Sequence, residues 1–450
     1  MNLQLLSLAL VASLTSLANA SLQIVSGGSW TASNGAHLQA HGPGVTKVGN
    51  TYYLIGENKL NGSSFQSINC YSSTNLVEWT YVGELLTLQS SGDLGPNRVV
   101  ERPKVIYNDA TEQYVMYMHI DSSNYGEAKV GVATGTSVCG KFTYRGSWRP
   151  LGFESRDMGL FKDDDGTAYL MTEDRSNGLR IDRLSSDYLN VTSNVYTWAE
   201  KYESPAILKR NGVYFMFGSH LTGWNTNDNI YSTATSLSGP WSAWKTFAPV
   251  GSNTFTSQTS FILPVSNSFA MFMGDRWTPS NLMASTYIWL PLTVSGTTAS
   301  LTWYDNWIPN VAAGTWSTAP TDTSYEAESG TISGGSQKLS CSGCSGGTSV
   351  GYLGGSSGGA LTINNIVTDI TGLTTVRIRY ANGDSTQRFA DVTVNGVKQR
   401  VAFVPSGGGQ MVFTASFTAG LVKGSGNTMK IEGVNGGWAP DVDVVIVPRS

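Results

Sequence analysis

The sequence repeats one pattern five times, and this repetition constrains the fold more than any other feature. Each unit begins with a polar residue, continues with a short apolar strand and a turn, and ends in further strands, the second of them aromatic. The lead residues stand 11 to 13 positions before the first aromatic residue of that second strand, and they are His41, Glu101, Asp157, Glu203 and Gln258. Repeats of about 40 to 50 residues built from several strands are typical of a β-propeller. We therefore predict a five-bladed β-propeller over residues 21–315.

The composition supports an all-β protein and excludes one class of partner. The chain has 450 residues, including 51 glycines, with 13% charged and 11% aromatic residues. This mixture suits turn-rich β structure. The formal charge is −4 and no cluster of Lys or Arg is present, so we do not expect nucleic-acid binding.

The lead residues acquire a meaning from propeller geometry. The first strand of each blade lines the central channel, so the residue at its start lies at one end of that channel. Glu101, Asp157 and Glu203 should therefore meet there, with His41 and Gln258 beside them. Carboxylates so close must have pKa values pushed apart, as in an acid–base site. The alternative is that each acid only helps to form a turn at a strand start.

A second unit follows the repeats. Residues 316–323 are small and polar and are expected to form a linker. Residues 324–450 contain short alternating strands, and the stretch Val394-Asn395-Gly396-Val397 is a strong signal for a two-residue hairpin. This pattern predicts a β-sandwich of the jelly-roll type.

The N-terminus and the cysteines indicate a secreted, extracellular protein. Residues 1–20 are apolar and end in Ala-Asn-Ala, as a cleaved signal peptide does, and no other run is long enough to span a membrane. An even number of cysteines favours disulfides in that setting. Cys341 and Cys344 are close enough to pair, which leaves Cys70 and Cys139 for a second bond. Asn61 and Asn190 lie in glycosylation sequons.

A channel mouth with acids of unequal pKa suits glycoside hydrolysis. One carboxylic acid protonates the leaving oxygen while another group activates water, and in inverting enzymes the two groups stand roughly 6.5–9.5 Å apart. Trp224, Trp277 and Tyr125 are candidates to stack on sugar faces at the rim. Each of the three has packing in the core as its alternative role.

Residues 21–315 resemble glycoside hydrolase family 43, whose members are five-bladed propellers that invert anomeric configuration. The resemblance rests on Asp157-Met-Gly-Leu-Phe and Glu203-Ser-Pro-Ala-Ile-Leu. It implies that Asp157 tunes the pKa of the acid and that Glu203 is the general acid.

The start of the first blade departs from the family pattern. The family places an aspartate before proline there as general base, whereas this sequence has Gly42-Pro43 after His41. The fungal exo-β-1,3-galactanase branch is similar in lacking that aspartate, and it carries residues like Glu101 and Gln258. The resemblance implies that Glu101 and Gln258 orient water and substrate, with the identity of the base left open.

The second unit resembles carbohydrate-binding module family 35 in its YEAES opening, its RYANG and VTVNG segments and its APDVDVVIV ending. The resemblance implies a structural Ca²⁺ held by Glu326, Glu328 and Asp443. Two carboxylates at i and i+2 on one strand face agree with this, since they repel unless a cation joins them. It also implies sugar contacts from five residues: Tyr352, Asn382, Arg388, Trp438 and Asp441.

These features together predict a secreted, monomeric exo-glycosidase that releases galactose from β-1,3-galactan, the backbone of arabinogalactan proteins, with no cofactor needed for catalysis. Two alternatives stay open: an arabinofuranosidase or xylosidase on the same propeller, and a non-catalytic lectin in which both domains bind sugar.

Overall fold

The computed structural model describes residues 21–449, so the expected signal peptide at residues 1–20 lies outside the described part of the chain. Five four-stranded antiparallel sheets follow one another along the sequence. They are β3–β6 (His41–Val48, Thr51–Glu57, Ser67–Ser73, Thr80–Thr87), β7–β10 (Arg98–Asn108, Gln113–Ser122, Lys129–Gly135, Thr143–Trp148), β11–β14 (Met158–Lys162, Ala168–Thr172, Arg180–Leu184, Val191–Thr197), β15–β18 (Tyr202–Arg210, Val213–His220, Ile230–Ala234, Lys245–Thr246) and β19–β22 (Gln258–Pro264, Ala270–Arg276, Thr286–Ser295, Thr298–Leu301).

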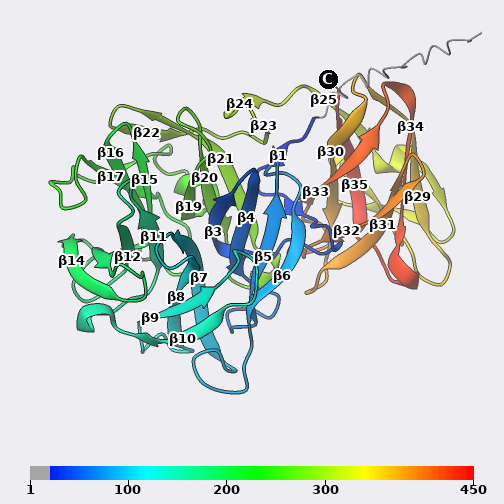
Figure 1. Ribbon diagram of the computed structural model, residues 1–450. Coiled ribbons are helices and arrows are strands. Elements are labelled where there is room, and N and C mark those ends of the chain that lie inside the picture. The colour runs from blue at the N-terminus through cyan, green and yellow to red at the C-terminus, as the bar shows by residue number, and fades with distance from the viewer. Residues whose placement is uncertain (1–20, 450) are drawn as a thin grey trace, which may run out of the picture.

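The five sheets form a closed ring, seen on the left of Figure 1. The first strand of each sheet contacts the first strand of the next, and β19 of the fifth sheet contacts β3 of the first. The ring is the predicted five-bladed propeller, and each predicted lead residue lies at or directly before the first strand of its blade. The fold class expected from the repeats is therefore confirmed.

Turn residues set the strand register as their sequence predicts. In the fourth blade Arg210 pairs with Val213 across Asn211 and Gly212, which have φ values of 52° and 78°. These left-handed angles are what a two-residue hairpin turn requires. Residues 162–166 also form a hairpin turn, between β11 and β12, in which Asp163 donates its backbone N–H to Thr167.

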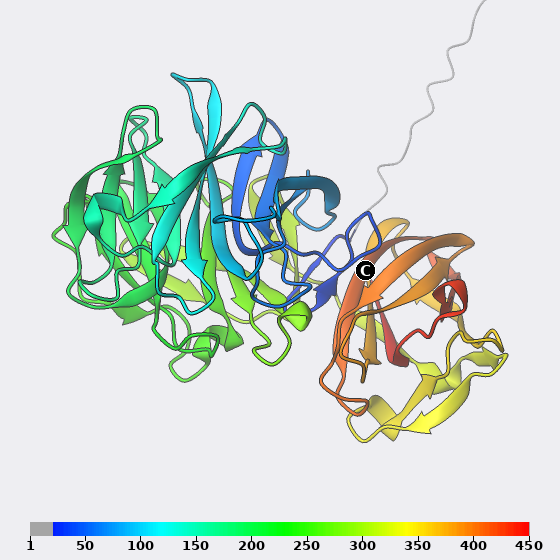
Figure 2. The same ribbon diagram turned by 90° about the horizontal axis from the view of Figure 1, so that it is seen from below.

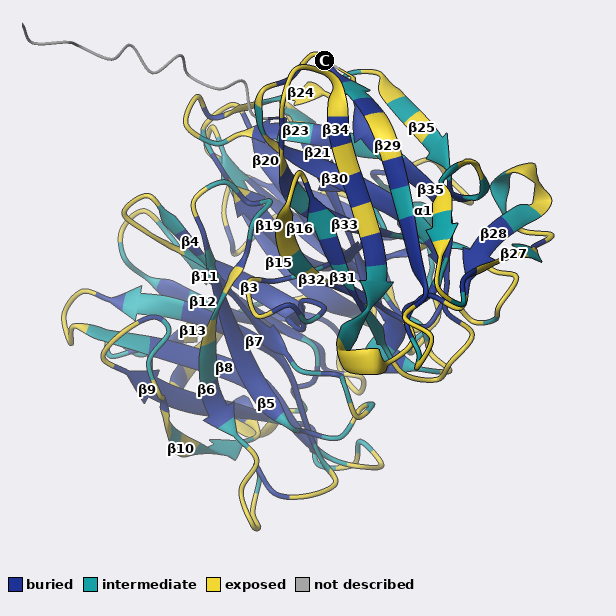
Figure 3. Cartoon of the chain, turned by 90° about the vertical axis from the view of Figure 1, so that its right-hand side faces the viewer, coloured by how far each residue is buried: buried dark blue, intermediate teal, exposed yellow. Residues whose placement is uncertain are grey.

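The propeller interior is filled by large apolar side chains. Trp289, Trp307, Phe215, Phe217 and Phe272 are all fully buried. Figure 3 shows the inner strands in almost uniform dark blue, as expected for strands that are covered on both faces.

The C-terminal unit consists of two facing sheets. One has the order β26-β29-β34-β31-β32 and the other β2-β33-β30-β35-β28-β27, with β25 added beside β35. Their strands are β25–β28 (Asp322–Glu326, Thr331–Ser333, Gln337–Ser340, Thr348–Gly351), β29–β32 (Ala360–Thr368, Gly372–Ala381, Arg388–Val394, Val397–Phe403) and β33–β35 (Phe413–Leu421, Gly424–Gly433, Asp441–Pro448). Buried and exposed residues alternate along β34 (Figure 3), so one face of its sheet packs in the sandwich core and the other meets solvent. Val394 pairs with Val397 in the predicted hairpin.

The N-terminal segment joins the two units. Strand β1 (Ile24–Val25) pairs with β23 (Asn306–Asn310), which pairs with β24 (Thr315–Thr318). Strand β2 (Ser29–Trp30) instead runs parallel to β33 and becomes part of the sandwich. Figure 2 shows this dark blue segment reaching from the propeller to the module. Residues 316–323, expected to be a linker, include the end of β24 and the start of β25.

All four cysteines form disulfides in the expected pairs. Cys341 pairs with Cys344 over a separation of 3 residues. Cys70 pairs with Cys139 over a separation of 69 residues. The second bond joins β5 of the first blade to the loop after β9 of the second blade. Within residues 21–449, no helix has the length and hydropathy needed to cross a membrane.

Candidate active site

Four of the five predicted lead residues line one pocket of about 330 Å³ at the end of the channel. The repeat pattern thus predicted the convergence of Glu101, Asp157, Glu203 and Gln258. The complete lining is Glu57, Glu101, Arg102, Asn124, Tyr125, Asp157, Arg175, Glu203, Gly223, Trp224, Gln258 and Trp277.

A β-bulge near the start of the inner strand gives the lead residues of four blades their orientation. The register shifts just after His41, Glu101 and Glu203, and between Thr259 and Phe261 in the fifth blade. In the first three cases the next residue has a left-handed backbone, with φ of 55° at Gly42, 53° at Arg102 and 60° at Ser204. A bulge bends the strand and redirects the side chains beside it.

Glu203 is positioned as a proton donor. It lies at the start of β15, and its side chain is 4% exposed. Burial, together with the negative charges of Asp157 and Glu173, raises its pKa to about 9, although Arg102 and Arg175 oppose this shift. The carboxyl is therefore protonated at neutral pH, which a general acid requires.

Asp157 connects the third blade to the bulge of the fourth. Its Oδ2 accepts hydrogen bonds from the backbone N–H of Ser204 at 3.1 Å and from the Ser204 hydroxyl at 2.9 Å. The same oxygen pairs with Nε of Arg102 at 2.7 Å. Asp157 thus fixes the residue that follows Glu203 and places a negative charge beside it.

Glu101 is held in the ionised form by its neighbours. Lys59 Nζ lies 3.2 Å from its Oε1, and the Tyr125 hydroxyl donates to the same oxygen at 3.0 Å. His119 Nδ1 lies 3.5 Å from Oε2. Burial alone would raise the pKa of Glu101, but Lys59 and His119 together lower it to about 2. The pocket therefore combines one protonated and one ionised carboxyl.

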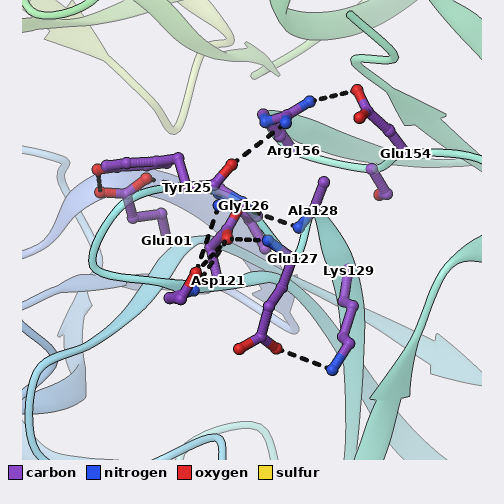
Figure 4. Close-up of polar contacts among 12 residues, drawn as sticks. Glu101, Asp121, Tyr125, Gly126, Glu127, Ala128, Lys129, Glu154 and Arg156 are labelled. Carbon is purple, nitrogen blue, oxygen red and sulfur yellow. Dashed lines mark hydrogen bonds and ion pairs between the residues drawn. The ribbon is translucent and has the colours of Figure 1, made fainter. Parts of the chain in front are cut away.

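Tyr125 reaches Glu101 because its loop is tied to the blade beneath it (Figure 4). The Asp121 carboxylate accepts the backbone N–H groups of Ser122, Glu127 and Ala128. Arg156 donates to the carbonyl of Tyr125 at 3.2 Å. The loop thereby presents the tyrosine hydroxyl to the pocket.

Two further buried acids were missed from the sequence. Glu57 lines the pocket and pairs with Lys59 at 2.6 Å, and Glu173 hydrogen-bonds the backbone N–H of Asp157 at 3.2 Å. Burial raises the pKa of both, with Lys59 opposing the shift at Glu57 and Asp157 adding to it at Glu173.

A sequence signal for these acids exists at the ends of the second strands. Each second strand returns to the pocket end of its blade, and at or near its end a polar residue stands opposite the lead residue. The facing pairs are His41 with Glu57, Glu101 with His119, Asp157 with Glu173, Glu203 with Ser219 and Gln258 with Asp275.

His41 does not line the pocket. Its side chain is fully buried, its Nδ1 lies 2.9 Å from Asp275 Oδ1, and its ring stacks on Tyr287. His41 was expected to contact the substrate, but its side chain has no exposed surface through which it could do so. The neighbouring Gly42 leaves room for the Glu57 side chain, because a Cβ at position 42 would lie only 2.3 Å from Oε1 of Glu57 and would clash with it.

The candidate aromatic residues form one wall of the pocket. Trp224 and Trp277 meet edge to face with ring centroids 4.8 Å apart. Lys59 lies 5.4 Å from the centre of the Trp224 ring. The Trp277 indole N–H donates to Gln258 at 2.9 Å. Aromatic faces of this kind can pack against the apolar face of a sugar ring.

The pocket acids offer two groups of possible metal ligands. Glu101, His119 and Asp157 form one, and Asp157, Glu173 and Glu203 form the other, each with ligand atoms within 4.8 Å of one another. Lys59, Arg102 and Arg175 already lie among these carboxylates as counter-charges. The protein's own cations thus balance this cluster.

The residues expected to bind sugar on the C-terminal module differ in exposure. Tyr352 and Trp438 are 50% and 49% exposed, and their rings meet edge to face with centroids 6.0 Å apart. Burial raises the pKa of Asp441, which lies near them, against the opposing charge of Arg388.

The other two expected sugar contacts are engaged by the protein itself. Arg388 donates to Asp384 and to the carbonyl of Ala439. Asn382 is fully buried and donates to the carbonyls of Thr386 and Phe403, so it supports the loop and is not presented to a ligand.

Two of the three predicted calcium ligands are hydrogen-bonded to one serine. Ser345 donates its backbone N–H to Asp443 at 2.9 Å and its hydroxyl to Glu326 at 2.7 Å. One oxygen each of Glu326, Glu328 and Asp443 is buried without a hydrogen-bond partner. Arg379 lies 3.3 Å from the free oxygen of Asp443 as an ion pair.

Comparisons with known proteins agree with this site. Residues 37–283 match the family model for glycosyl hydrolases family 43. The structure of an exo-β-1,3-galactanase from Phanerochaete chrysosporium is 44% identical, covers 94% of this chain and 100% of its own, and has a TM-score of 0.67. An exo-β-1,3-galactanase from Clostridium thermocellum is 27% identical, covers 93% and 99%, and has a TM-score of 0.64. An extracellular endo-α-(1→5)-L-arabinanase from Bacillus subtilis is 24% identical over 47% of this chain and 69% of its own.

The comparison corrects the expectation for the second unit. Residues 360–447 match the model for a CBM13-like domain of α-galactosidase, so the assignment to carbohydrate-binding module family 35 is wrong. The quoted segments YEAES, RYANG and VTVNG are strand ends and turns in this structure, including the hairpin at residues 394–397. Such short turn patterns recur among β-sandwich modules and do not distinguish their families.

The family model covers more than half of the chain, and the Phanerochaete chrysosporium structure is matched over its full length. The matched residues include the pocket formed by the lead residues of four of the five blades. The chain therefore belongs to glycosyl hydrolases family 43.

Proposed function

We propose that the protein is an exo-β-1,3-galactanase that cleaves galactose from the ends of β-1,3-galactan chains. The observation that carries this is the convergence of a buried, protonated Glu203 and an ionised Glu101 in one pocket. Structural neighbours with 44% and 27% identity are described as exo-β-1,3-galactanases. One of them was solved with galactose and with β-1,3-galactotriose. The volume of about 330 Å³ is at the small end for ligand pockets and suits a single terminal sugar ring.

In the proposed reaction, Glu203 gives its proton to the glycosidic oxygen as the bond from that oxygen to the anomeric carbon breaks. A water molecule attacks the anomeric carbon from the opposite face and loses a proton to a pocket group. Glu101 orients the water and the sugar, and Asp157 raises the pKa of Glu203. The hydrogen-bonding positions of the Gln258 amide are taken by protein groups, so Gln258 acts on Glu203 through its amide N–H. The products are galactose with inverted anomeric configuration and a chain shortened by one sugar.

The test is a panel of substrates with detection of the first-formed anomer by NMR. We expect the release of galactose from β-1,3-galactan and from β-1,3-galactotriose, with the α-anomer formed first. Preferential release of arabinose or xylose from arabinan or xylan would replace it with the alternative glycosidase activity. Binding of galactan without any release of galactose would instead support the alternative of a non-catalytic lectin.

We also propose that the C-terminal module binds galactan through Tyr352, Trp438 and Asp441. The two half-exposed rings, with the partly buried Asp441 three residues after Trp438, support this. Replacing Trp438 with alanine should weaken retention of the full chain on insoluble galactan. A matched replacement of Tyr304, whose ring packs on Trp316 away from the module pair, is the control.

A Ca²⁺ ion is proposed for Glu326, Glu328 and Asp443. The support is the set of three buried carboxylate oxygens without hydrogen-bond partners, of which only that of Asp443 has a cation beside it, Arg379 at 3.3 Å. The oxygens of Glu326 and Glu328 carry an unfavourable desolvation cost unless a cation binds them. Bound there, the ion would join the strand end at Glu326 to β35 and stabilise the sandwich.

We propose that the protein is secreted, because residues 1–20 have the sequence of a signal peptide and because two observations from the structure agree with secretion. Both disulfides are formed, and the sequon residues Asn61 and Asn190 are exposed on the surface, where they are accessible to glycosylation. Mass spectrometry of the secreted protein before and after deglycosylation tests the two sites and the mature N-terminus.

A further inference from the structure

Arg102 has an unusual backbone conformation for a buried arginine. It follows Glu101 at the bulge of β7, has a φ of 53° and is 4% exposed. A non-glycine residue in this region is strained and persists only where its surroundings hold it. Its backbone N–H donates to Glu57 Oε1 at 2.7 Å, and Lys104 Nζ lies 3.3 Å from its carbonyl oxygen. These contacts fix the bulge.

The bulge directs the guanidinium group of Arg102 across the pocket. Its Nε pairs with Asp157 of the third blade at 2.7 Å. Its Nη1 donates to the carbonyl of Thr259 at 3.0 Å, and its Nη2 donates to Oε1 of Gln258 at 2.5 Å, both in the fifth blade. All three nitrogens are thus occupied by groups around Glu203.

The orientation of the Gln258 amide follows from these donors. Its oxygen accepts from Arg102 and also from the Trp277 indole at 2.9 Å, which uses both lone pairs. Its nitrogen therefore faces the other way and donates to Glu203 Oε1 at 2.8 Å and to Ser219 at 3.3 Å. Neither Arg102 nor Trp277 can accept a hydrogen bond, so neither tolerates a reversed amide.

We propose that Arg102 is a positioning residue that, through the amide of Gln258, determines which carboxyl oxygen of Glu203 carries the acid proton. An amide N–H can only donate, so Oε1 of Glu203 accepts and the proton resides on Oε2. With the amide reversed, the oxygen of Gln258 would accept a hydrogen bond from a protonated Oε1, and the proton would be held there and withheld from the substrate. This inference rests on the proposed role of Glu203 as general acid.

The kinetic test begins with Arg102→Met, which removes the guanidinium but keeps much of the apolar volume. We expect kcat to fall by about 10²–10⁴-fold, the usual contribution of a proton donor, with KM changed much less. The charged groups facing Glu203 are Asp157, Glu173, Arg102 and Arg175. Loss of the positive Arg102 should move the alkaline limb of the kcat profile to higher pH.

A double-mutant cycle separates positioning from loss of charge. If Arg102 acts through Gln258, then Arg102→Met should have little further effect on kcat in a Gln258→Met background. Independent, multiplicative losses would overturn the inference. Trp277→Phe removes the other donor to the same oxygen without touching the bulge, and it should also lower kcat more than it raises KM. If Arg102→Met does not fold, Trp277→Phe combined with Gln258→Met gives the same cycle.

Arg180→Met is the matched control, because Arg180 is equally buried but pairs with Asp182 and Asp174 away from the pocket. It should lower stability and leave the pH profile of the folded enzyme unchanged. An inactive wild-type protein on β-1,3-galactan would defeat the proposed function itself. An active wild type whose Trp277 and Gln258 variants lose kcat independently would defeat only the role of the amide.

Discussion

Lys59 places its ammonium group 2.6 Å from Glu57 and 3.2 Å from Glu101, and so joins two pocket carboxylates from neighbouring blades. The lysine is 1% exposed. Its charge is a main reason that Glu101 stays ionised in spite of burial.

Replacing Lys59 with methionine should therefore raise the pKa of Glu101. If ionised Glu101 is needed for activity, the acid limb of the kcat/KM profile will move to higher pH, and activity at acidic pH will fall more than activity at neutral pH. Measurement of kcat/KM on galactotriose across the pH range tests this. The matched control is Lys129→Met, which removes a partly exposed pair with Glu127. A Lys59 variant with a uniformly lowered but unshifted profile would contradict the prediction.

Glu203→Gln should abolish turnover and preserve binding. The amide has the same shape but no proton to give, so kcat on galactotriose should fall by about 10²–10⁴-fold. The dissociation constant, measured by calorimetry, should change only a few-fold. Equal losses in both quantities would show that Glu203 contributes to binding and is not the acid.

The same substitution should change stability in a pH-dependent way. The pKa of Glu203 is about 9 in the folded protein and 4.5 as its ordinary value. Between these values the folded state binds more protons than the unfolded state, so the wild type loses stability as pH rises through this window. Glu203→Gln removes that loss. The variant should match the wild type at pH 4 and have the higher Tm at pH 8, by calorimetry.

The fold was predictable where the sequence repeats and less so where it does not. Five lead residues at regular spacing were sufficient to place the blades, and Asn211-Gly212 and Asn395-Gly396 indicated their hairpins because only a few residue types accept left-handed angles. Strand β2 could not be predicted in this way, because two residues that pair with a strand almost 400 positions later carry no local pattern.

The site was predictable in its acids and less so in their partners. Lead positions were found because a repeat aligns them, while Glu57 and Glu173 at the ends of the second strands were overlooked although the same repeat aligns them too. Asn382 illustrates the opposite error. The resemblance to carbohydrate-binding module family 35 implied a sugar contact from this residue, but its amide is used to satisfy buried carbonyl groups.

The two disulfides should differ greatly in their contribution to stability. Cys70–Cys139 encloses a chain separation of 69 residues, so its removal should cost about 4 kcal/mol through the entropy of the unfolded state. Cys341–Cys344 spans only 3 residues, and by the same relation its removal should cost about 1.5 kcal/mol. Urea unfolding of the paired Cys→Ala variants gives both values. A larger loss for the Cys341–Cys344 variant would rule out loop entropy as the main term.

Chelation should act on the module and spare the propeller. If Ca²⁺ binds at Glu326, Glu328 and Asp443, removing it with EDTA leaves the buried oxygens of Glu326 and Glu328 without a cation and should lower the Tm of the sandwich. Glu328→Gln should reduce that sensitivity. An EDTA effect of the same size in this variant would place the ion elsewhere, and kcat on galactotriose should be the same with and without the chelator.

Strand β2 is synthesised near the start of the chain, but its partner β33 is synthesised late, with only about thirty residues after it. The arm at residues 21–31 must therefore wait while the whole propeller is made. A protein truncated after the fifth blade would have a propeller whose N-terminal segment lacks its partner strand β33. A module expressed from residue 320 would lack β2, so the edge of β33 that β2 covers would be unpaired. The propeller and the module are separate in sequence, but they cannot be exchanged as independent domains.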